Sequence, residues 1–310
     1  MRVAALDGRS CLVGGGSHLD VETASGGKFG PDPMNAFYDW ENFRSWASEQ
    51  DLTTGSPYRA EQMTCPVPTP DQIFGIGLNY RSHADESAME VPKQPMVFTK
   101  FPSALSGPYD DIPLVPGSCD WEVELVVVVA RSGRDFEHVN IEGYIAGLTV
   151  GQDLSERDLQ LAGNNPQFSL AKSHRGFAPI GPEVVTLDEF ESPWDLEIRC
   201  DRNDVNVQQA RTSQLIHGIP SLLVYLSSIC ELRAGDLVFT GTPSAGHLRS
   251  TWSPVTCSTR LSRGSARSGT GAFDFRPLPR HGCDGLYRLL GNPPSSHRRV
   301  RCRGLRSEYG

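Results

Sequence analysis

The stretch CDWEVELVVVVA, residues 119–130, places two glutamates at the start of an apolar run. Because side chains alternate across a strand, Glu122 and Glu124 point to one face and their carboxylates converge. The valines that follow indicate a strand that is buried on both faces. Two ionised carboxylates on a buried face repel each other, so the fold must supply a shared proton, basic partners or a cation. The alternative is a solvated strand end that faces surface lysines and arginines.

A third carboxylate follows in the segment GYIAGLTVGQDLSERDLQ. Its apolar half predicts a strand, and Ser155 is expected to cap the next helix, with Asp158 as the acid of a capping box. Asp153 therefore falls in the strand-to-helix turn. If this strand neighbours the one with the glutamates, three oxygen ligands meet, a set that suits Mg²⁺, Mn²⁺ or Ca²⁺ better than zinc. Taken alone, Asp153 is more typical of a turn or a helix cap.

A histidine and a glutamate lie three residues apart in GLNYRSHADES. On a helix, His83 and Glu86 would share a face, where the carboxylate could orient the imidazole and raise its basicity. That arrangement is typical of a general base that takes a proton from water. An exposed surface helix commonly shows the same pair, so both interpretations stay open at this point.

Two further motifs could contact an anionic ligand. Lys172 in FSLAKSHRGFAPIGP is bracketed by apolar residues, which predicts an ammonium held near a polar cavity. A surface lysine that buries only its stem is the alternative. In FTGTPSAG, Thr240, Gly241 and Thr242 could offer backbone amides and hydroxyls to an anion, although the loop lacks the pattern of a nucleotide-binding P-loop.

The chain of 310 residues contains no apolar run long enough to span a membrane. The apolar run in the N-terminal MRVAALDGRS is too short for a secretion signal. The eight cysteines are scattered, without the spacing of a metal site or a disulfide framework. We therefore expect a cytoplasmic protein with reduced thiols.

Three parts are expected along the chain. Residues 1–68 predict a small N-terminal domain, with a hairpin at Asp7-Gly8 and a helix in DPMNAFYDWENFRSWASEQ. Residues 69–246 predict a strand-rich catalytic domain. Residues 247–310 carry twelve arginines, no lysine and a net charge of +9, against −17 for the rest of the chain. This last part shows no sustained hydrophobic period and is predicted to be disordered.

Six segments resemble the fumarylacetoacetate hydrolase family. They are GIGLNYRSHADE, FTKFPSALSGP, WEVELVVVV, GYIAGLTVGQDLSERDLQ, KSHRGFAPIGP and LRAGDLVFTGTPS. Each motif is weak by itself, but their order and spacing agree with the family from about residue 70 to residue 244. The resemblance implies an α+β fold built on a mixed β-roll or β-sandwich, a small N-terminal domain and a homodimer.

Carried over position by position, the resemblance implies a metal centre and a dyad. Glu122, Glu124 and Asp153 match ligands of Mg²⁺ or Mn²⁺, with Ca²⁺ as an alternative. His83 and Glu86 match a dyad on a mobile lid that activates water.

The resemblance also implies a substrate site. Gln160 and Lys172 match residues that contact the substrate and stabilise negative charge, and Gly241 and Thr242 match its substrate-binding loop. Arg157 matches a position that we interpret as structural. The implied substrate is a small 2-oxo or 1,3-dicarbonyl carboxylic acid, cleaved hydrolytically at a carbon–carbon bond as in acylpyruvates. The same residues could instead isomerise or decarboxylate related acids.

The sequence departs from the family pattern in two places. The family commonly has Lys-Ser-x-Asp where this chain has Lys172, Ser173, His174 and Arg175, so a cation replaces a carboxylate. The family's closing segments are not visible after Ala245.

The abrupt change of composition after residue 246 is what a frameshift in a GC-rich gene would produce. A basic tail that binds nucleic acid is the rival interpretation. It is disfavoured because such tails also use lysine and aromatic residues. Since lost closing strands would expose core surface, a metal-binding but non-catalytic remnant is the alternative to an enzyme.

Overall fold

The computed structural model describes residues 1–86, 91–113, 115–202, 205–244, 255–262 and 288–290. Within these residues, twelve strands form the largest sheet. The main path of the sheet runs β4 (Ser56–Pro57), β3 (Ser17–Asp20), β2 (Arg9–Gly14), β1 (Arg2–Leu6), β14 (Ala178–Val185), β12 (Ile145–Gln152), β11 (Val123–Val129), β17 (Leu237–Phe239), β6 (Ile73–Gly77) and β7 (Met96–Thr99). Strands β5 (Met63–Thr64) and β8 (Leu105–Ser106) pair at its side. The predicted α+β class with a mixed sheet is confirmed.

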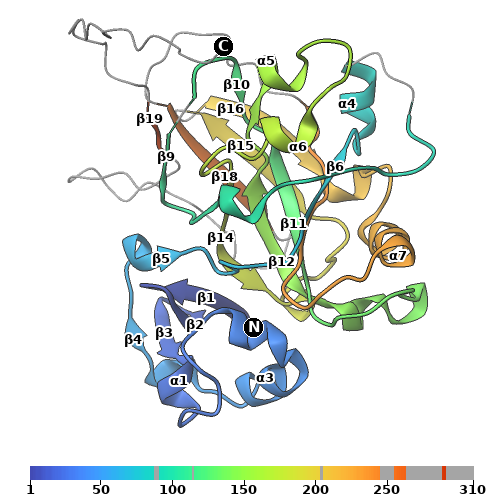
Figure 1. Ribbon diagram of the computed structural model, residues 1–310. Coiled ribbons are helices and arrows are strands. Elements are labelled where there is room, and N and C mark those ends of the chain that lie inside the picture. The colour runs from blue at the N-terminus through green and yellow to red at the C-terminus, as the bar shows by residue number, and fades with distance from the viewer. Residues whose placement is uncertain (87–90, 114, 203–204, 245–254, 263–287, 291–310) are drawn as a thin grey trace, which may run out of the picture.

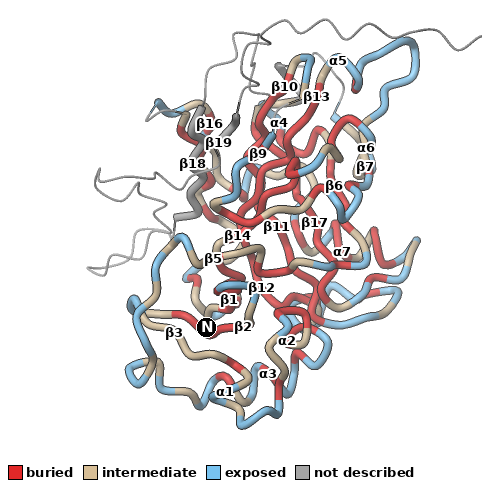
Figure 2. The backbone as a smooth tube through the Cα atoms, turned by 60° about the vertical axis from the view of Figure 1, so that its left-hand side comes forward, coloured by how far each residue is buried: buried red, intermediate tan, exposed pale blue. Residues whose placement is uncertain are grey.

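Strand β11 lies in the middle of this sheet and is buried along its whole length, as Figure 2 shows. It pairs antiparallel with β12 on one side and with β17 on the other. Leu125, Val127 and Val129 belong to one hydrophobic cluster, whereas Val126 and Val128 belong to a second one on the opposite face. The run of valines therefore joins two cores, which accounts for the continuous apolar pattern.

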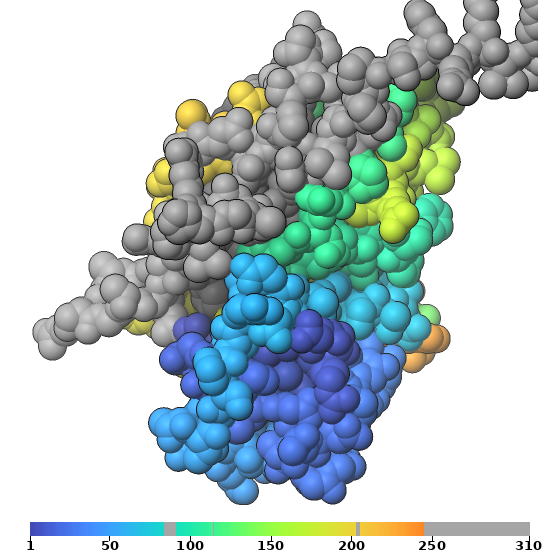
Figure 3. Space-filling model, turned by 90° about the vertical axis from the view of Figure 1, so that its left-hand side faces the viewer, coloured from blue at the N-terminus to red at the C-terminus, as the bar shows by residue number. Residues whose placement is uncertain are grey.

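The N-terminal residues share this sheet. Strand β1 pairs antiparallel with β14, setting Arg2 opposite Val185. The helix predicted in this region is divided at Asp39 into α2 (Met34–Tyr38) and α3 (Trp40–Ala47). These helices pack their aromatic side chains into the same cluster as one face of β11. Figures 1 and 3 show the N-terminal residues, in blue, forming one end of the molecule. No helix in the described ranges is both long and apolar enough to cross a membrane.

A second, five-stranded sheet packs against the first in the described part of the chain. Its order is β16 (Val205–Arg211), β15 (Glu197–Arg202), β18 (Val255–Ser262), β19 (Arg288–Leu290) and β9 (Asp111–Pro113). The predicted hairpin is formed by β15 and β16, while its turn lies outside the described residues. Of the segment 247–310, only β18 and β19 are described, and their backbones pair in this sheet.

Short helices gather at one end of the two sheets. Figures 1 and 2 show α4 (Arg81–Glu86), α5 (Arg157–Gln160) and α6 (Phe168–Ala171) there, away from the N-terminal strands. The expected helix cap at Ser155 is wrong. Ser155 lies in β13 (Ser155–Glu156), which pairs with β10 (Cys119–Asp120), and the carboxylate of Glu156 accepts the backbone N–H groups that open α5. A glutamate reaches these amides from one residue further along, so the helix begins later than predicted.

Candidate metal centre

Glu122 and Glu124 lie at the start of β11, and Asp153 directly follows β12. The structure brings these three side chains together. Each offers one carboxylate oxygen, and the three oxygens lie within 4.8 Å of one another. All three side chains are buried. The backbone fixes the arrangement, because Asp153 donates its N–H to the carbonyl of Glu122 at 2.8 Å. The carboxylates therefore converge on one point inside the protein, as the spacing predicted.

Two buried lysines face this triad from different segments. Lys172 Nζ lies 2.6 Å from Oε2 of Glu122 and 2.6 Å from Oδ2 of Asp153. Lys100 Nζ lies 2.5 Å from the other oxygen of Asp153 and also donates to the carbonyls of Leu154 and Lys172. The alternative of a solvated strand end is thus excluded for the glutamates, and that of a surface lysine for Lys172.

An arginine closes the other side of Glu122. Arg157 donates to the carboxylates of Asp120 and Glu122 and, at 2.7 Å, to Oε1 of Gln160. Burial opposes ionisation of Glu122, but the charges of Lys172 and Arg157 outweigh it and hold the pKa of Glu122 well below its usual range. Arg157 therefore contacts the site directly, beyond the structural role expected for it.

Glu124 differs from its neighbours because no lysine or arginine in the described ranges forms an ion pair with it. Its Oε2 accepts the backbone N–H of Gly241 at 2.7 Å. Burial and the negative charges of Asp153 and Glu122 raise the pKa of Glu124 well above its usual range. Without a cation, Glu124 therefore favours its protonated form.

The loop that follows β17 forms the next wall of the site. Asn79 donates to the Thr240 carbonyl at 2.8 Å, and Ser82 donates to the Pro243 carbonyl at 2.8 Å. These bonds tie the loop to α4, the helix that carries His83. Glu86 lies at the end of α4, and its side chain lies outside the described residues. The structure therefore attaches the predicted dyad helix to the loop without describing the dyad itself.

The aromatic ring of Phe98 lies against the ammonium group of Lys172. Its ammonium lies 5.0 Å from the centre of the Phe98 ring. A Cβ atom at Gly75 would lie 2.4 Å from that ring, so only glycine lets Phe98 pack down against β6. Arg175, the residue that replaces the carboxylate of the family pattern, is exposed, whereas Lys172 is buried.

The donor set fits a hard divalent cation. Three carboxylate oxygens converge, which is the ligand type that Mg²⁺, Mn²⁺ and Ca²⁺ prefer. The raised pKa of Glu124 points the same way, because a bound cation would offset both its burial and the negative charges of Asp153 and Glu122. Asp153, Glu122 and Glu124 are therefore the residues that would hold the ion.

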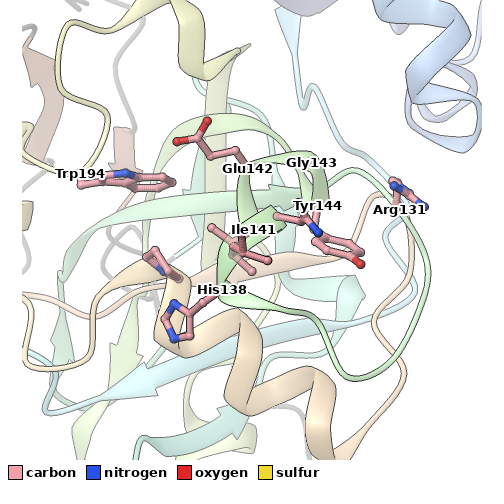
Figure 4. A pocket seen from close by; sticks show the side chains of 10 residues that line it. Arg131, His138, Ile141, Glu142, Gly143, Tyr144 and Trp194 are labelled. Carbon is pink, nitrogen blue, oxygen red and sulfur yellow. The ribbon is translucent and has the colours of Figure 1, made fainter.

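A separate open hollow of about 630 Å³ lies around the turn η4 (His138–Tyr144). Figure 4 shows its side chains splayed, with Arg131 and His138 far apart. Arg131 lies over the ring of Tyr144, 5.4 Å from the ring centre to its Cζ atom. The polar groups do not converge on a point, so this hollow does not rival the carboxylate site.

Sequence reasoning missed Asp120, Lys100 and Gln208, and it missed the bridging role of Arg157. Asp120 precedes Glu122 by two positions, so the alternation that revealed the glutamates also places it on their face. Lys100 is a lone cation among apolar residues in MVFTKF, which is a recognisable signal. Gln208 on β16, which contacts Thr242, carried no signal in the sequence.

Comparison with known proteins identifies the family of the chain. A sequence profile described as fumarylacetoacetate (FAA) hydrolase C-terminal matches residues 72–267, which include β18. The oxaloacetate tautomerase FAHD2A of Homo sapiens, a mitochondrial protein, is 35% identical over 244 residues, covering 74% of this chain and 77% of the human one.

Solved structures show the same fold. A putative HpcE protein from Mycobacterium smegmatis is 46% identical, with a TM-score of 0.77, covering 84% of this chain and 95% of that one. A maleylpyruvate hydrolase from Sphingobium, crystallised with manganese(II) and pyruvate, is 28% identical, with a TM-score of 0.68, covering 84% and 94%. The relatives thus include enzymes with two different activities.

Proposed function

The chain belongs to the fumarylacetoacetate hydrolase family, and from that membership we propose that it is a divalent-metal-dependent enzyme that interconverts the keto and enol forms of a 2-oxo dicarboxylic acid. The observation that carries this proposal is the buried triad with Lys172 against two of its members. Mg²⁺ and Mn²⁺ are the proposed cofactors. An oxaloacetate-like acid is the proposed substrate class, because relatives at 35% identity carry that name.

A divalent ion held by the triad would polarise the 2-oxo group of a chelated acid and favour its enol form. In the interconversion, a C–H bond breaks at the carbon next to the oxo group and an O–H bond forms on the oxo oxygen. The residues of the chain must then hold an anion, exclude water and move one proton.

Lys172 is suited to stabilise the negative charge. Burial disfavours its charged form, but Asp153 and Glu122 outweigh this effect and raise the pKa of Lys172 above its usual value. Two of its three N–H groups are used by these carboxylates among the described residues. The third is free to donate to the oxo oxygen as charge develops there, in a site formed by buried side chains.

Hydrolytic cleavage of a carbon–carbon bond is the second candidate. The maleylpyruvate hydrolase neighbour favours it, and so does the attachment of α4, with His83, to the loop beside Glu124. In that reaction water forms a bond to a carbonyl carbon, the adjacent C–C bond breaks, and the leaving carbon takes up a proton. His83 would accept the proton that water loses.

The test uses the purified chain with Mn²⁺, with Mg²⁺ and with a chelator. Decay of the enol absorbance of oxaloacetate reports tautomerisation, and pyruvate released from an acylpyruvate reports hydrolysis. We expect tautomerisation that the chelator abolishes and that Glu124→Gln removes, while the exposed Glu137→Gln retains it. Chelator-resistant turnover would contradict the proposal. Folded, metal-bound protein without turnover on either substrate would instead support the non-catalytic remnant.

A further inference from the structure

The ladder between β11 and β17 stops beside the metal ligands. Its register sets Val126 opposite Phe239, and if it continued it would set Val123 opposite Thr242. The chain instead turns at Gly241, whose φ of 102° is open only to glycine in practice. A Cβ there would lie 2.7 Å from Cβ of Asn79. The turn brings the Gly241 N–H to Glu124 and carries Thr242 away from its strand partner.

The side-chain amide of a residue in the five-stranded sheet takes the position opposite Val123 that Thr242 would have occupied in the ladder. Gln208 of β16 accepts the N–H of Val123 through its Oε1 at 3.0 Å. Its Nε2 donates to Oγ1 of Thr242 at 3.0 Å and to the carbonyl of Ser244 at 2.5 Å. Gln208 and Thr242 are both 3% exposed. One glutamine thus replaces a backbone partner and links the strand between the two glutamates to the loop after Gly241.

This contact determines what the Thr242 hydroxyl can do. A threonine hydroxyl has one hydrogen to donate and two lone pairs. Because Nε2 of Gln208 donates to Oγ1, one lone pair is occupied and the hydrogen must point elsewhere. Among the described residues it has a bond only to the Ser244 carbonyl, at 3.5 Å, the outer limit of a hydrogen bond. The hydrogen is therefore available to a stronger acceptor such as a carboxylate oxygen.

We propose that Gln208 is a positioning residue that holds the Thr242 hydroxyl as a hydrogen-bond donor to an anionic oxygen of the substrate. The proposal rests on the proposed function in one respect, since it takes the ligand to be a small acid bound beside the metal. It deepens that function by naming what orients the acid. Gln208 itself does not touch the ligand.

A purely structural role for Gln208 predicts a different pattern of effects. If the Gln208 amide only accepted the backbone N–H of Val123, its loss would disturb the backbone between the two glutamates and weaken metal binding. If it acts through Thr242, its loss should weaken binding of the acid and leave the metal affinity nearly unchanged. The two roles are therefore separable by measuring both ligands on the same variants.

The experiment measures Mn²⁺ binding, and then oxalate binding to the Mn²⁺-loaded protein, by calorimetry. The variants are Gln208→Leu, Thr242→Val and their combination. The control is Gln209→Leu, since Gln209 is the next residue on β16 and bonds only to Glu197 at the surface, at 2.7 Å, among the contacts described. We expect each single variant to weaken oxalate about tenfold, the cost of one charge-assisted hydrogen bond. The double variant should be no weaker than the poorer single one, and Mn²⁺ affinity should change less than about threefold.

Additive losses in the double variant, or parallel losses of Mn²⁺ and oxalate, would overturn the proposal. So would a wild-type protein that binds Mn²⁺ but not oxalate. If Gln208→Leu does not fold, Gln208→Glu replaces it, because a carboxylate still accepts the Val123 N–H but draws the Thr242 hydrogen to itself. That variant must then lose oxalate affinity while the melting temperature is kept. If the single and double variants lose oxalate affinity as expected but the wild-type protein shows no turnover, the role of Gln208 stands and only the proposed activity is refuted.

Discussion

Lys100 and Asp153 form a fully buried ion pair, with 2.5 Å between Nζ and Oδ1 and no exposed side-chain surface on either residue. The same ammonium donates to the carbonyls of Leu154 and Lys172. Lys100 thus holds one oxygen of Asp153, a proposed metal ligand, and also fixes the backbone on either side of the site. Lys172 holds the other oxygen of Asp153, so the orientation of this carboxylate is set by two lysines.

Replacing Lys100 by methionine should destabilise the fold by about 3 kcal/mol, because the change leaves buried acceptors without their donor. It should also weaken Mn²⁺ binding, since Lys172 alone then orients Asp153. Urea unfolding and calorimetric titration measure the two effects. The matched control is Lys93→Met on an exposed residue. A loss of stability no larger than that of the control would show that Lys100 does not hold the site.

Metal binding should become tighter as the pH rises. The pKa of Glu124 is raised by burial and by the negative charges of Asp153 and Glu122, so the ion must displace a proton from it. The apparent affinity should increase by up to about tenfold per pH unit while Glu124 stays protonated in the free protein. Titrations with Mn²⁺ at several pH values test this, and Glu124→Gln should abolish the slope. An affinity independent of pH in the wild-type protein would refute the assignment of the proton.

Acid should destabilise the N-terminal part of the fold, because Asp20 becomes protonated. Hydrogen bonding to Arg9 lowers the pKa of Asp20 to about 2, and Asp20 also caps α1 (Val21–Ala24). Because the folded value lies below the unfolded one, this stabilisation is present above about pH 4 and is lost as the pH falls towards 2. Both partners are partly solvated, so we expect only about 1 kcal/mol.

Asp20→Asn is expected to lower the unfolding free energy at neutral pH and to remove its acid dependence in that window. Glu49→Gln, on an exposed residue of the same end, serves as the control. Equal acid sensitivity in Asp20→Asn and in the wild-type protein would argue against this role.

Gly241→Ala should damage the site more than its size suggests. The residue has a φ of 102°, and an added methyl group would meet Asn79 at 2.7 Å and the Ile76 carbonyl at 3.0 Å. We expect a loss of about 2 kcal/mol in stability and weaker Mn²⁺ binding, since the Gly241 N–H would leave Glu124. The control is Gly143→Ala, where nothing lies within 4 Å. Equal melting temperatures for the two variants would contradict this account.

The centre of the site was predictable because local patterns encode it. Alternation placed Glu122 and Glu124 on one face, and the valines after them required burial. The strand before Asp153 ended where the apolar pattern ended. These signals lie within a few residues of each other, and the pairing of β11 with β12 then brings them together.

What was not predictable depends on residues far apart in the chain. Lys100 reaches Asp153 across 53 positions and the Lys172 carbonyl across 72. Gln208 joins two sheets, and its role exists only because the turn at Gly241 breaks a ladder. The pairing of β1 with β14, which merges the N-terminal strands into the main sheet, is likewise absent from any local pattern.

The most direct test of the account is anomalous diffraction from crystals of the protein grown with Mn²⁺. One strong peak is predicted, with carboxylate oxygens of Glu122, Glu124 and Asp153 at about 2.0–2.4 Å from it. A weaker peak in Glu124→Gln crystals would agree with the account. A manganese peak that touches none of the three carboxylates, or none at all at saturating Mn²⁺, would contradict it.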